Sequence, residues 1–197
     1  MNPDPIDQLA TALACTGTVI DAISADQWRS PTLCTDWNVT ELVEHLATGN
    51  AGFEAALRHQ DPTPPATDGR ADTDPAIRYR QSIAGLVDAF SAPGVMDRLM
   101  TVPFGTVPGA VAANLRLTEV LVHGWDLAQA TGHPISAFPE YLAEAALAFT
   151  RGSLGAIPPG RSPFAPPQPV ADDAPAIDRL AACLGRPVPS PIRAPAS

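Results

Sequence analysis

One pair of residues could bind a metal ion from a single helix. Glu119 and His123 lie four residues apart in a stretch that is otherwise rich in Leu and Val. Four residues is close to one helical turn, so the carboxylate and the imidazole project from the same face. A carboxylate among apolar side chains needs a compensating charge, which a divalent cation would supply. An ion pair or a hydrogen-bonded core pair would also supply it, and for this spacing alone that is the simpler interpretation.

A third residue shifts the balance towards a metal. His45 lies on a second amphipathic stretch with apolar neighbours. Catalytic zinc sites often have three protein ligands and one open position, and helical bundles build such sites from facing helices. The alternative for His45 is a surface or capping histidine. Together, His45, Glu119 and His123 favour a divalent metal site, zinc first, with nickel or manganese as the other candidates.

Three nearby residues have two interpretations each. Asp126 follows His123 by three residues, so it could accept a hydrogen bond from a ligand imidazole, or it could face solvent. Glu41 precedes His45 by four residues, but a capping role at the start of that helix explains it more simply. Cys34 could lie near the metal or be a small buried residue. No residue is assigned as a catalytic acid, base or nucleophile.

Composition and charge exclude several classes of protein. The net charge of -9 argues against a nucleic-acid partner, because phosphate binding needs a basic surface. No apolar run approaches the length of a membrane span, and the first residues do not resemble a secretory signal. Three widely spaced cysteines are more typical of reduced thiols than of a disulfide framework. We therefore expect a cytoplasmic protein with no membrane partner.

The hydrophobic periodicity predicts an all-α bundle of four long helices with further helical pieces. The Pro- and Gly-rich stretches at 61–74 and 94–109 read as loops, the second irregular or briefly extended. We expect a helical bundle over residues 1–151, a proline-rich segment and a short packed helix over 152–187, and a disordered tail over 188–197. The expected helices run from Pro5 to about Trp28, Asn38 to Arg58, Asp74 to Phe90, Pro108 to Ala130, Pro139 to Arg151 and Pro175 to Leu184.

Two segments resemble a known family. The stretch from Pro31 to Leu46, PTLCTDWNVTELVEHL, and the stretch from Glu119 to Ala128, EVLVHGWDLA, are similar to the signature segments of the mycothiol-dependent maleylpyruvate isomerase N-terminal family. That family belongs to the DinB-like metal-binding superfamily. The segment from Ala176 to Pro187 also resembles the end of uncharacterised metal-binding members, so the resemblance covers roughly residues 5 to 187.

The resemblance implies a DinB-like four-helix bundle that binds a divalent metal, usually zinc, through His, Glu and His. Those ligands fall on His45, Glu119 and His123. It also implies a low-molecular-weight thiol such as mycothiol as cosubstrate, and a small electrophilic substrate. The resulting hypothesis is a thiol-dependent transferase or isomerase. The alternative is a non-catalytic, metal-bound protein that binds or sequesters a small molecule.

The chain departs from the family pattern in two places. The isomerase carries a second, C-terminal domain, whereas only a proline-rich stretch and a short helix follow residue 151 here. Maleylpyruvate isomerisation itself is therefore not carried over. Leu33 stands where the signature has a proline before the cysteine, which alters only the local turn.

Overall fold

The computed structural model describes residues 4–34, 37–58, 74–102, 105–154 and 165–189. Its elements, in chain order, are α1 (Pro5–Asp21), α2 (Val39–Leu57), α3 (Pro75–Phe90), β1 (Leu99–Val102), β2 (Gly105–Pro108), α4 (Gly109–Thr131), the 3-10 turn η2 (Ile135–Ala137), α5 (Glu140–Leu154) and α6 (Ala176–Cys183). The predicted all-α architecture is confirmed. No helix of the described ranges is both long and apolar enough to cross a membrane.

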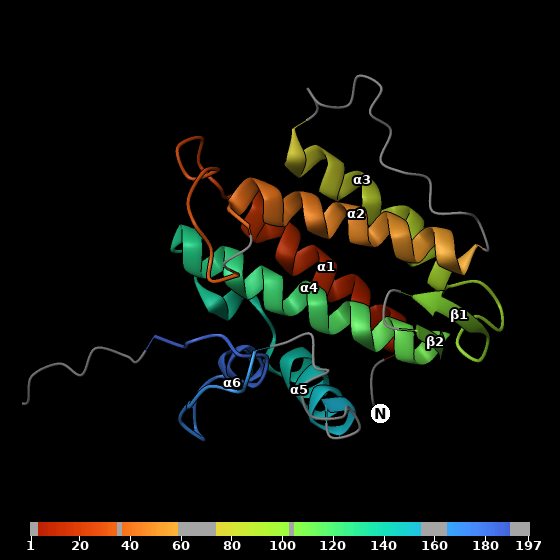
Figure 1. The fold of residues 1–197 in the computed structure, drawn as a ribbon. Helices are drawn as coiled ribbons and strands as arrows, with labels where there is room; N and C mark the ends of the chain where they lie inside the picture. Colours follow the sequence, from red (N-terminus) through yellow and green to blue (C-terminus); the bar gives the residue numbers. More distant parts are fainter. Residues whose placement is uncertain (1–3, 35–36, 59–73, 103–104, 155–164, 190–197) are drawn as a thin grey trace, which may run out of the picture.

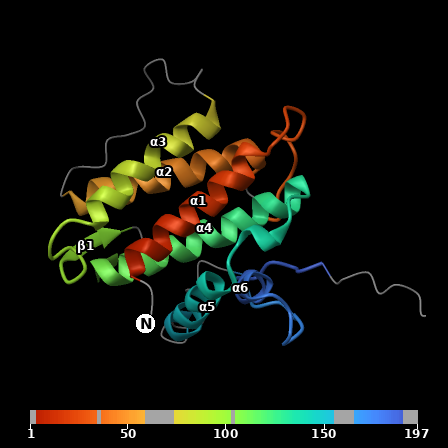
Figure 2. The same cartoon turned by 180° about the vertical axis from the view of Figure 1, so that it is seen from behind.

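Helices α1 to α4 form a four-helix bundle (Figure 1). Helix α4 packs on α1 and α2, while α3 closes the other side against the same two helices. Seen from behind, α5 and α6 lie together beside α4, outside the bundle (Figure 2). Since α4 contacts α1 and α2 within the bundle and α5 and α6 outside it, nearly all its residues from Leu117 to Ala128 are buried.

Helix starts and stops follow local chemistry. The Asp4 carboxylate accepts from the Ile6 N–H at 2.8 Å and so caps α1. Asn38 and Glu41 form the reciprocal capping box that starts α2, which is the role expected for Glu41. Gly132 ends α4 with a left-handed φ of 72°, a conformation that suits glycine.

One local expectation is wrong, and another is made more definite by the structure. The first helix ends at Asp21 rather than near Trp28, because the Ser24 N–H donates to the Gln27 side chain at 3.0 Å instead of to a helical carbonyl. The stretch around 99–108, expected to be irregular or briefly extended, contains two short strands, β1 and β2, that pair antiparallel. Pro108, the last residue of β2, is compatible with this pairing, because a two-stranded sheet has no central strand.

Close contact between α1 and α4 sets the position of α4. A Cβ added at Gly124 would lie 2.5 Å from the Thr16 hydroxyl and 2.8 Å from the Phe138 ring. The same hydroxyl donates to the Val120 carbonyl at 3.2 Å. Gly124 follows His123 directly, so this contact also fixes the backbone that carries the candidate ligand.

The C-terminal segment is joined to the bundle by polar contacts. The indole N–H of buried Trp125 donates to Asp178 on α6 at 2.7 Å. Arg186, which follows α6, donates from Nη2 to Asp126 of α4 at 3.1 Å. Within the segment itself, the Gln168 N–H donates to the Ala182 carbonyl at 2.9 Å. Within the predicted 152–187 segment, the described part thus contacts α4. The tail beyond residue 189 and the loop at 59–73 lie outside the described residues.

Candidate metal centre

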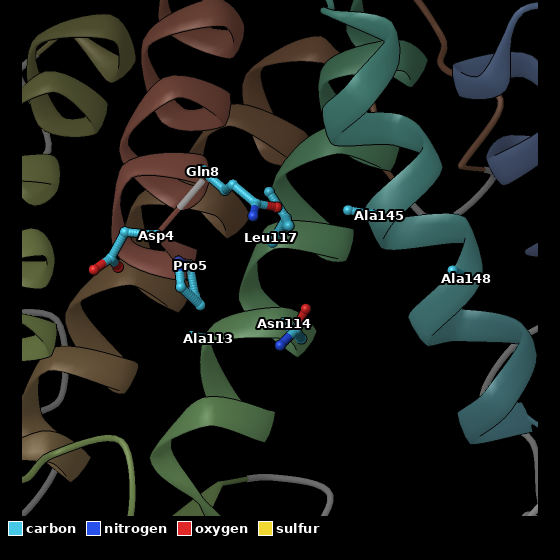
Figure 3. Close-up of a pocket in the computed structure, with 8 residues that line it drawn as sticks. All are labelled: Asp4, Pro5, Gln8, Ala113, Asn114, Leu117, Ala145 and Ala148. Carbon is cyan, nitrogen blue, oxygen red and sulfur yellow. The ribbon is translucent and has the colours of Figure 1, made fainter. Parts of the chain in front are cut away.

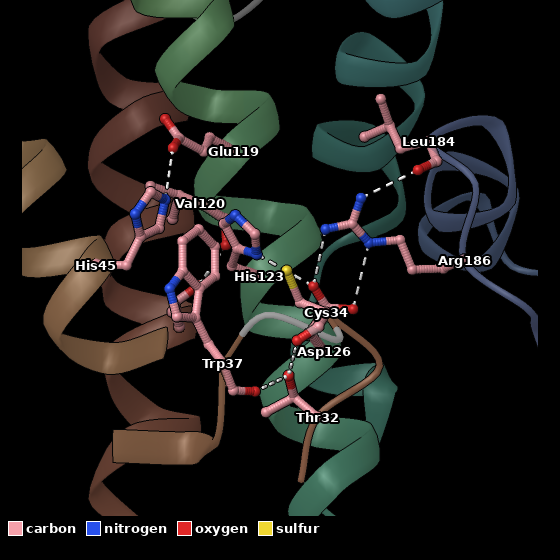
Figure 4. A network of polar contacts seen from close by, with 11 residues as sticks. Thr32, Cys34, Trp37, His45, Glu119, Val120, His123, Asp126, Leu184 and Arg186 are labelled. Carbon is pink, nitrogen blue, oxygen red and sulfur yellow. Dashed lines mark hydrogen bonds and ion pairs between the residues drawn. The ribbon is translucent and has the colours of Figure 1, made fainter. Parts of the chain in front are cut away.

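The three predicted ligands converge at one point between two helices. His45 comes from α2, and Glu119 and His123 come from α4, one turn apart. One donor atom from each residue can be chosen so that all three lie within 4.8 Å of one another. Figure 4 shows the two imidazoles and the carboxylate grouped beside Trp37. Packing of α2 on α4 therefore brings together residues that are 74 positions apart in the chain.

The His45 and Glu119 side chains are already paired. His45 Nε2 donates to Glu119 Oε1 at 2.9 Å, and the two side chains are 30% and 23% exposed. A metal ion would take the place of the shared proton, because both atoms are ordinary zinc donors. The partial exposure leaves this side of the centre accessible.

His123 is held by a buried carboxylate. Its Nδ1 donates to Asp126 Oδ2 at 3.1 Å, and Asp126 is fully buried rather than facing solvent. A hydrogen on Nδ1 leaves the lone pair of the neutral ring on Nε2, the nitrogen free to bind a metal. Arg186, which follows α6, donates to the same carboxylate from Nη2 at 3.1 Å (Figure 4). The C-terminal segment thus reaches the centre through Asp126.

A buried cation keeps Glu119 ionised. Burial alone raises the pKa of Glu119, but the Arg116 charge and the hydrogen bond from His45 outweigh it, so the pKa falls to about 2. Arg116 Nη1 donates to Glu119 Oε2 at 2.8 Å. The carboxylate is therefore charged at neutral pH, as a metal ligand must be.

Trp37 covers one face of the centre. Its ring stacks on the His45 ring, with centroids 4.2 Å apart and planes inclined by 21°. It meets the His123 ring in a T-shaped arrangement, with centroids 5.9 Å apart. The stacking restricts how the His45 ring can turn. Trp37 is thus a wall of the centre as well as part of the bundle edge.

Cys34 lies close enough to offer a second cluster. It groups with His123 and Asp126, with all three donor atoms within 4.8 Å of one another. In that cluster Asp126 is already bound to the Arg186 cation, which opposes a second positive charge there. Two imidazoles and an ionised carboxylate in the first cluster match the donor set of a divalent metal better.

The described structure also has a pocket of about 460 Å³ on another side of α4 (Figure 3). It lies between the start of α1, α4 and α5. Helix α4 contributes Ala113, Asn114 and Leu117 to its lining. Its lining includes none of the three candidate ligands.

Two functional neighbours were not predicted from the sequence. Arg116 precedes Glu119 by three residues, and that helical spacing is a signal that could have found it. Arg186 had no such signal, because it reaches Asp126 across 60 residues of chain.

We expect the metal-free protein to lose stability as the pH falls below 7. Burial, opposed by Asp126, lowers the pKa of His123 from its ordinary 6.5. Below 6.5 the unfolded chain therefore binds a proton that the folded chain does not, so the free energy of unfolding falls as the pH falls towards the depressed pKa. The contribution of this one group is at most about 1.4 kcal/mol per pH unit.

Urea unfolding in the presence of a chelator at pH 7.5 and 5.5 measures this loss. The His123→Asn variant keeps a side-chain N–H for Asp126 and removes the titration, so its loss should be smaller. Equal losses of unfolding free energy in the two proteins would show that His123 is not the group responsible.

Comparison with known proteins identifies similar chains. Residues 9–128 match the family model described as the mycothiol maleylpyruvate isomerase N-terminal domain. Two uncharacterized proteins of Mycobacterium tuberculosis, from strains CDC 1551 / Oshkosh and H37Rv, are each 37% identical over 190 residues, which is 94% of this chain and 99% of theirs.

Two solved structures have a similar fold. The crystal structure of a histidine-to-alanine mutant of the mycothiol-dependent maleylpyruvate isomerase aligns with a TM-score of 0.59 at 15% identity. A second crystal structure of that isomerase aligns with a TM-score of 0.56 at 17% identity. Each alignment covers 75% of this chain and 70% of the other.

Proposed function

Because the chain belongs to the mycothiol maleylpyruvate isomerase N-terminal domain family, we propose that it is a metal- and thiol-dependent enzyme. It binds one divalent ion, zinc, through His45, Glu119 and His123. Its cosubstrate is a low-molecular-weight thiol such as mycothiol, and its substrate is a small electrophile. The reaction is a thiol transfer or an isomerisation in the cytoplasm.

Convergence of the three donors carries this proposal. Two imidazoles and a carboxylate from α2 and α4 meet within 4.8 Å, with Glu119 ionised and His123 held by Asp126. A structural ion pair would need only His45 and Glu119. The orientation of His123 by a buried carboxylate is the usual support for a metal-binding imidazole.

The metal centre and its neighbouring residues have separate roles in the proposed reaction. The bound ion would lower the pKa of a thiol, so that thiolate is present at neutral pH. Asp126 keeps His123 in the metal-binding tautomer, and Trp37 shields one face of the centre from water. The thiolate would add to one carbon of a substrate C=C bond, and the π electrons of that bond would move to the conjugated carbonyl. Protonation of the adduct from solvent would give a thiol conjugate. Rotation about the resulting single bond, followed by return of the electron pair and expulsion of the thiolate, would give an isomer.

One observation favours a non-catalytic alternative, a metal-bound protein that binds a small molecule. Asp126 is engaged by both His123 and Arg186, so it is not available as an acid or base. A binding protein needs no such group. The thiol-dependent reaction needs none either if the thiolate is the nucleophile, so turnover decides between the two.

Loss of an electrophile in the presence of mycothiol tests the proposal. Zinc-loaded protein is incubated with mycothiol and a panel of α,β-unsaturated acids that includes maleylpyruvate, and products are identified by mass. We expect an isomer or a thiol conjugate that requires protein, metal and thiol together. Binding of thiol without any product across the panel would favour the binding protein.

Metal removal should leave the fold largely intact. Helices α1 to α4 bury an apolar core that does not include the three ligands, so the metal is not needed to hold them together. Far-ultraviolet circular dichroism before and after chelation should show the same helical signal. Complete loss of that signal would assign the metal a structural role.

A further inference from the structure

Arg116 is a fully buried cation beside the metal centre. It lies on α4, and its side chain has no exposed area. Its guanidinium donates from Nε to Asn50 Oδ1 at 2.8 Å, from Nη2 to the Leu46 carbonyl at 2.7 Å, and from Nη1 to Glu119 Oε2 at 2.8 Å. A buried charge costs free energy of desolvation unless several good bonds offset it, and here each guanidinium nitrogen donates one.

The surrounding helices fix where that guanidinium lies. A Cβ added at Gly49 of α2 would lie 2.5 Å from Arg116 Nη1, so α2 leaves room for the cation only because this residue is glycine. Asn50 in turn donates to Ser82 of α3 at 2.8 Å. The Arg116 side chain is therefore held by α2 and, through Asn50, by α3.

The two oxygens of Glu119 face different partners. Oε2 accepts from Arg116, while Oε1 faces His45 Nε2 and the point where the three donors converge. A carboxylate can bind a cation through one oxygen or through both. With Oε2 held by a rigid cation, only Oε1 remains for the metal.

We propose that Arg116 is a positioning residue that restricts Glu119 to a single metal-binding oxygen and so keeps a coordination position open. This inference rests on the proposed metal centre. The position that a second carboxylate oxygen would fill is left to the thiol. The Arg116 charge also draws electron density from Glu119, so the centre binds an anionic sulfur more readily and the metal itself less tightly.

The two possible roles of Arg116 predict opposite effects on metal affinity. If its role were purely structural, removing it would loosen Glu119 and weaken metal binding. Loss of an outer partner usually weakens metal binding by roughly 10- to 100-fold. Removing a restricting arginine instead lets both oxygens bind, so Arg116→Met should bind cobalt more tightly than the wild type at a pH where Glu119 is ionised in both proteins. The visible cobalt absorption should weaken, because added ligands move the ion away from tetrahedral geometry. The change in absorption on adding mycothiol should shrink or vanish.

The experiment compares cobalt affinity, visible spectrum and mycothiol response in the wild type, Arg116→Met, Arg116→Lys and Gly49→Ala. Lysine keeps the charge but not the three separate donors of the guanidinium, so Arg116→Lys should lie between the wild type and Arg116→Met. Alanine at Gly49 pushes the guanidinium away from Glu119 and should shift all three readouts in the direction of Arg116→Met. Arg80→Met removes an arginine from an exposed pair with Asp21 and is the matched control.

Unchanged or weaker cobalt binding with an unchanged spectrum in both Arg116→Met and Gly49→Ala overturns this inference and leaves the metal centre standing. Failure of the wild type to bind cobalt overturns the metal centre and the inference together. If neither variant folds, a crystal structure of the cobalt-loaded wild type decides. One Glu119 oxygen bonded to cobalt supports the inference, and two Glu119 oxygens bonded to cobalt contradict it.

Discussion

Alanine at His45, Glu119 or His123 should each lower zinc affinity by more than the roughly 10- to 100-fold that loss of an outer partner costs. Each residue contributes one of three converging donors, and two donors from one or two helices do not hold zinc well. Competition with a chromogenic chelator measures the affinity, and circular dichroism confirms that each variant is folded.

His133→Ala is the matched control, because His133 follows the end of α4 and belongs to neither donor cluster. It should retain wild-type zinc affinity. Wild-type zinc content in the His123→Ala protein would overturn the three-ligand assignment.

Alanine at Asp126 should have two large effects. It removes the acceptor for His123 Nδ1, so zinc affinity should fall by roughly 10- to 100-fold. It also leaves Arg186, which is 11% exposed, without its carboxylate, and breaking a buried charged pair costs about 3–5 kcal/mol. Chelator competition measures the first effect and urea unfolding of the metal-free protein the second.

Asparagine at Asp126 separates the two effects. It keeps an oxygen that can accept from His123 but removes the charge that pairs with Arg186. We expect zinc affinity nearer the wild type and a stability loss close to that of alanine. Equal zinc affinity in the wild type and the Asp126→Ala protein would show that this carboxylate does not support the ligand.

Most of the bundle could be predicted because its signals are local. The capping box of Asn38 and Glu41, the Asp4 cap and Gly132 mark helix ends within a few residues of chain. The predicted end of α1 was wrong. Ser24 hydrogen-bonds to the side chains of Gln27 and Asp26 instead of continuing the helix, and hydrophobic spacing does not report such bonds. Pairing of β1 with β2 depends on contacts between two short segments that are individually ambiguous.

The centre was partly predictable for the same reason. Glu119 and His123 share one helix face, and the ligand set that includes His45 followed from residue types and from the family resemblance. Arg116 was missed although it lies on the same helix, because an arginine among apolar residues is usually placed at the surface. Arg186 depends on how the C-terminal segment packs, and sequence spacing carries no information about that.

Addition of a thiol to the cobalt-loaded protein tests most directly whether the metal centre has an open position for a thiol. Cobalt replaces zinc in the Cys34→Ala protein, which excludes the sulfur nearest the centre, and mycothiol is then added. We predict a new sulfur-to-cobalt absorption band at neutral pH, with an apparent thiol pKa below the free value of about 8.5. A cobalt spectrum that does not respond to mycothiol would contradict thiol chemistry at this centre.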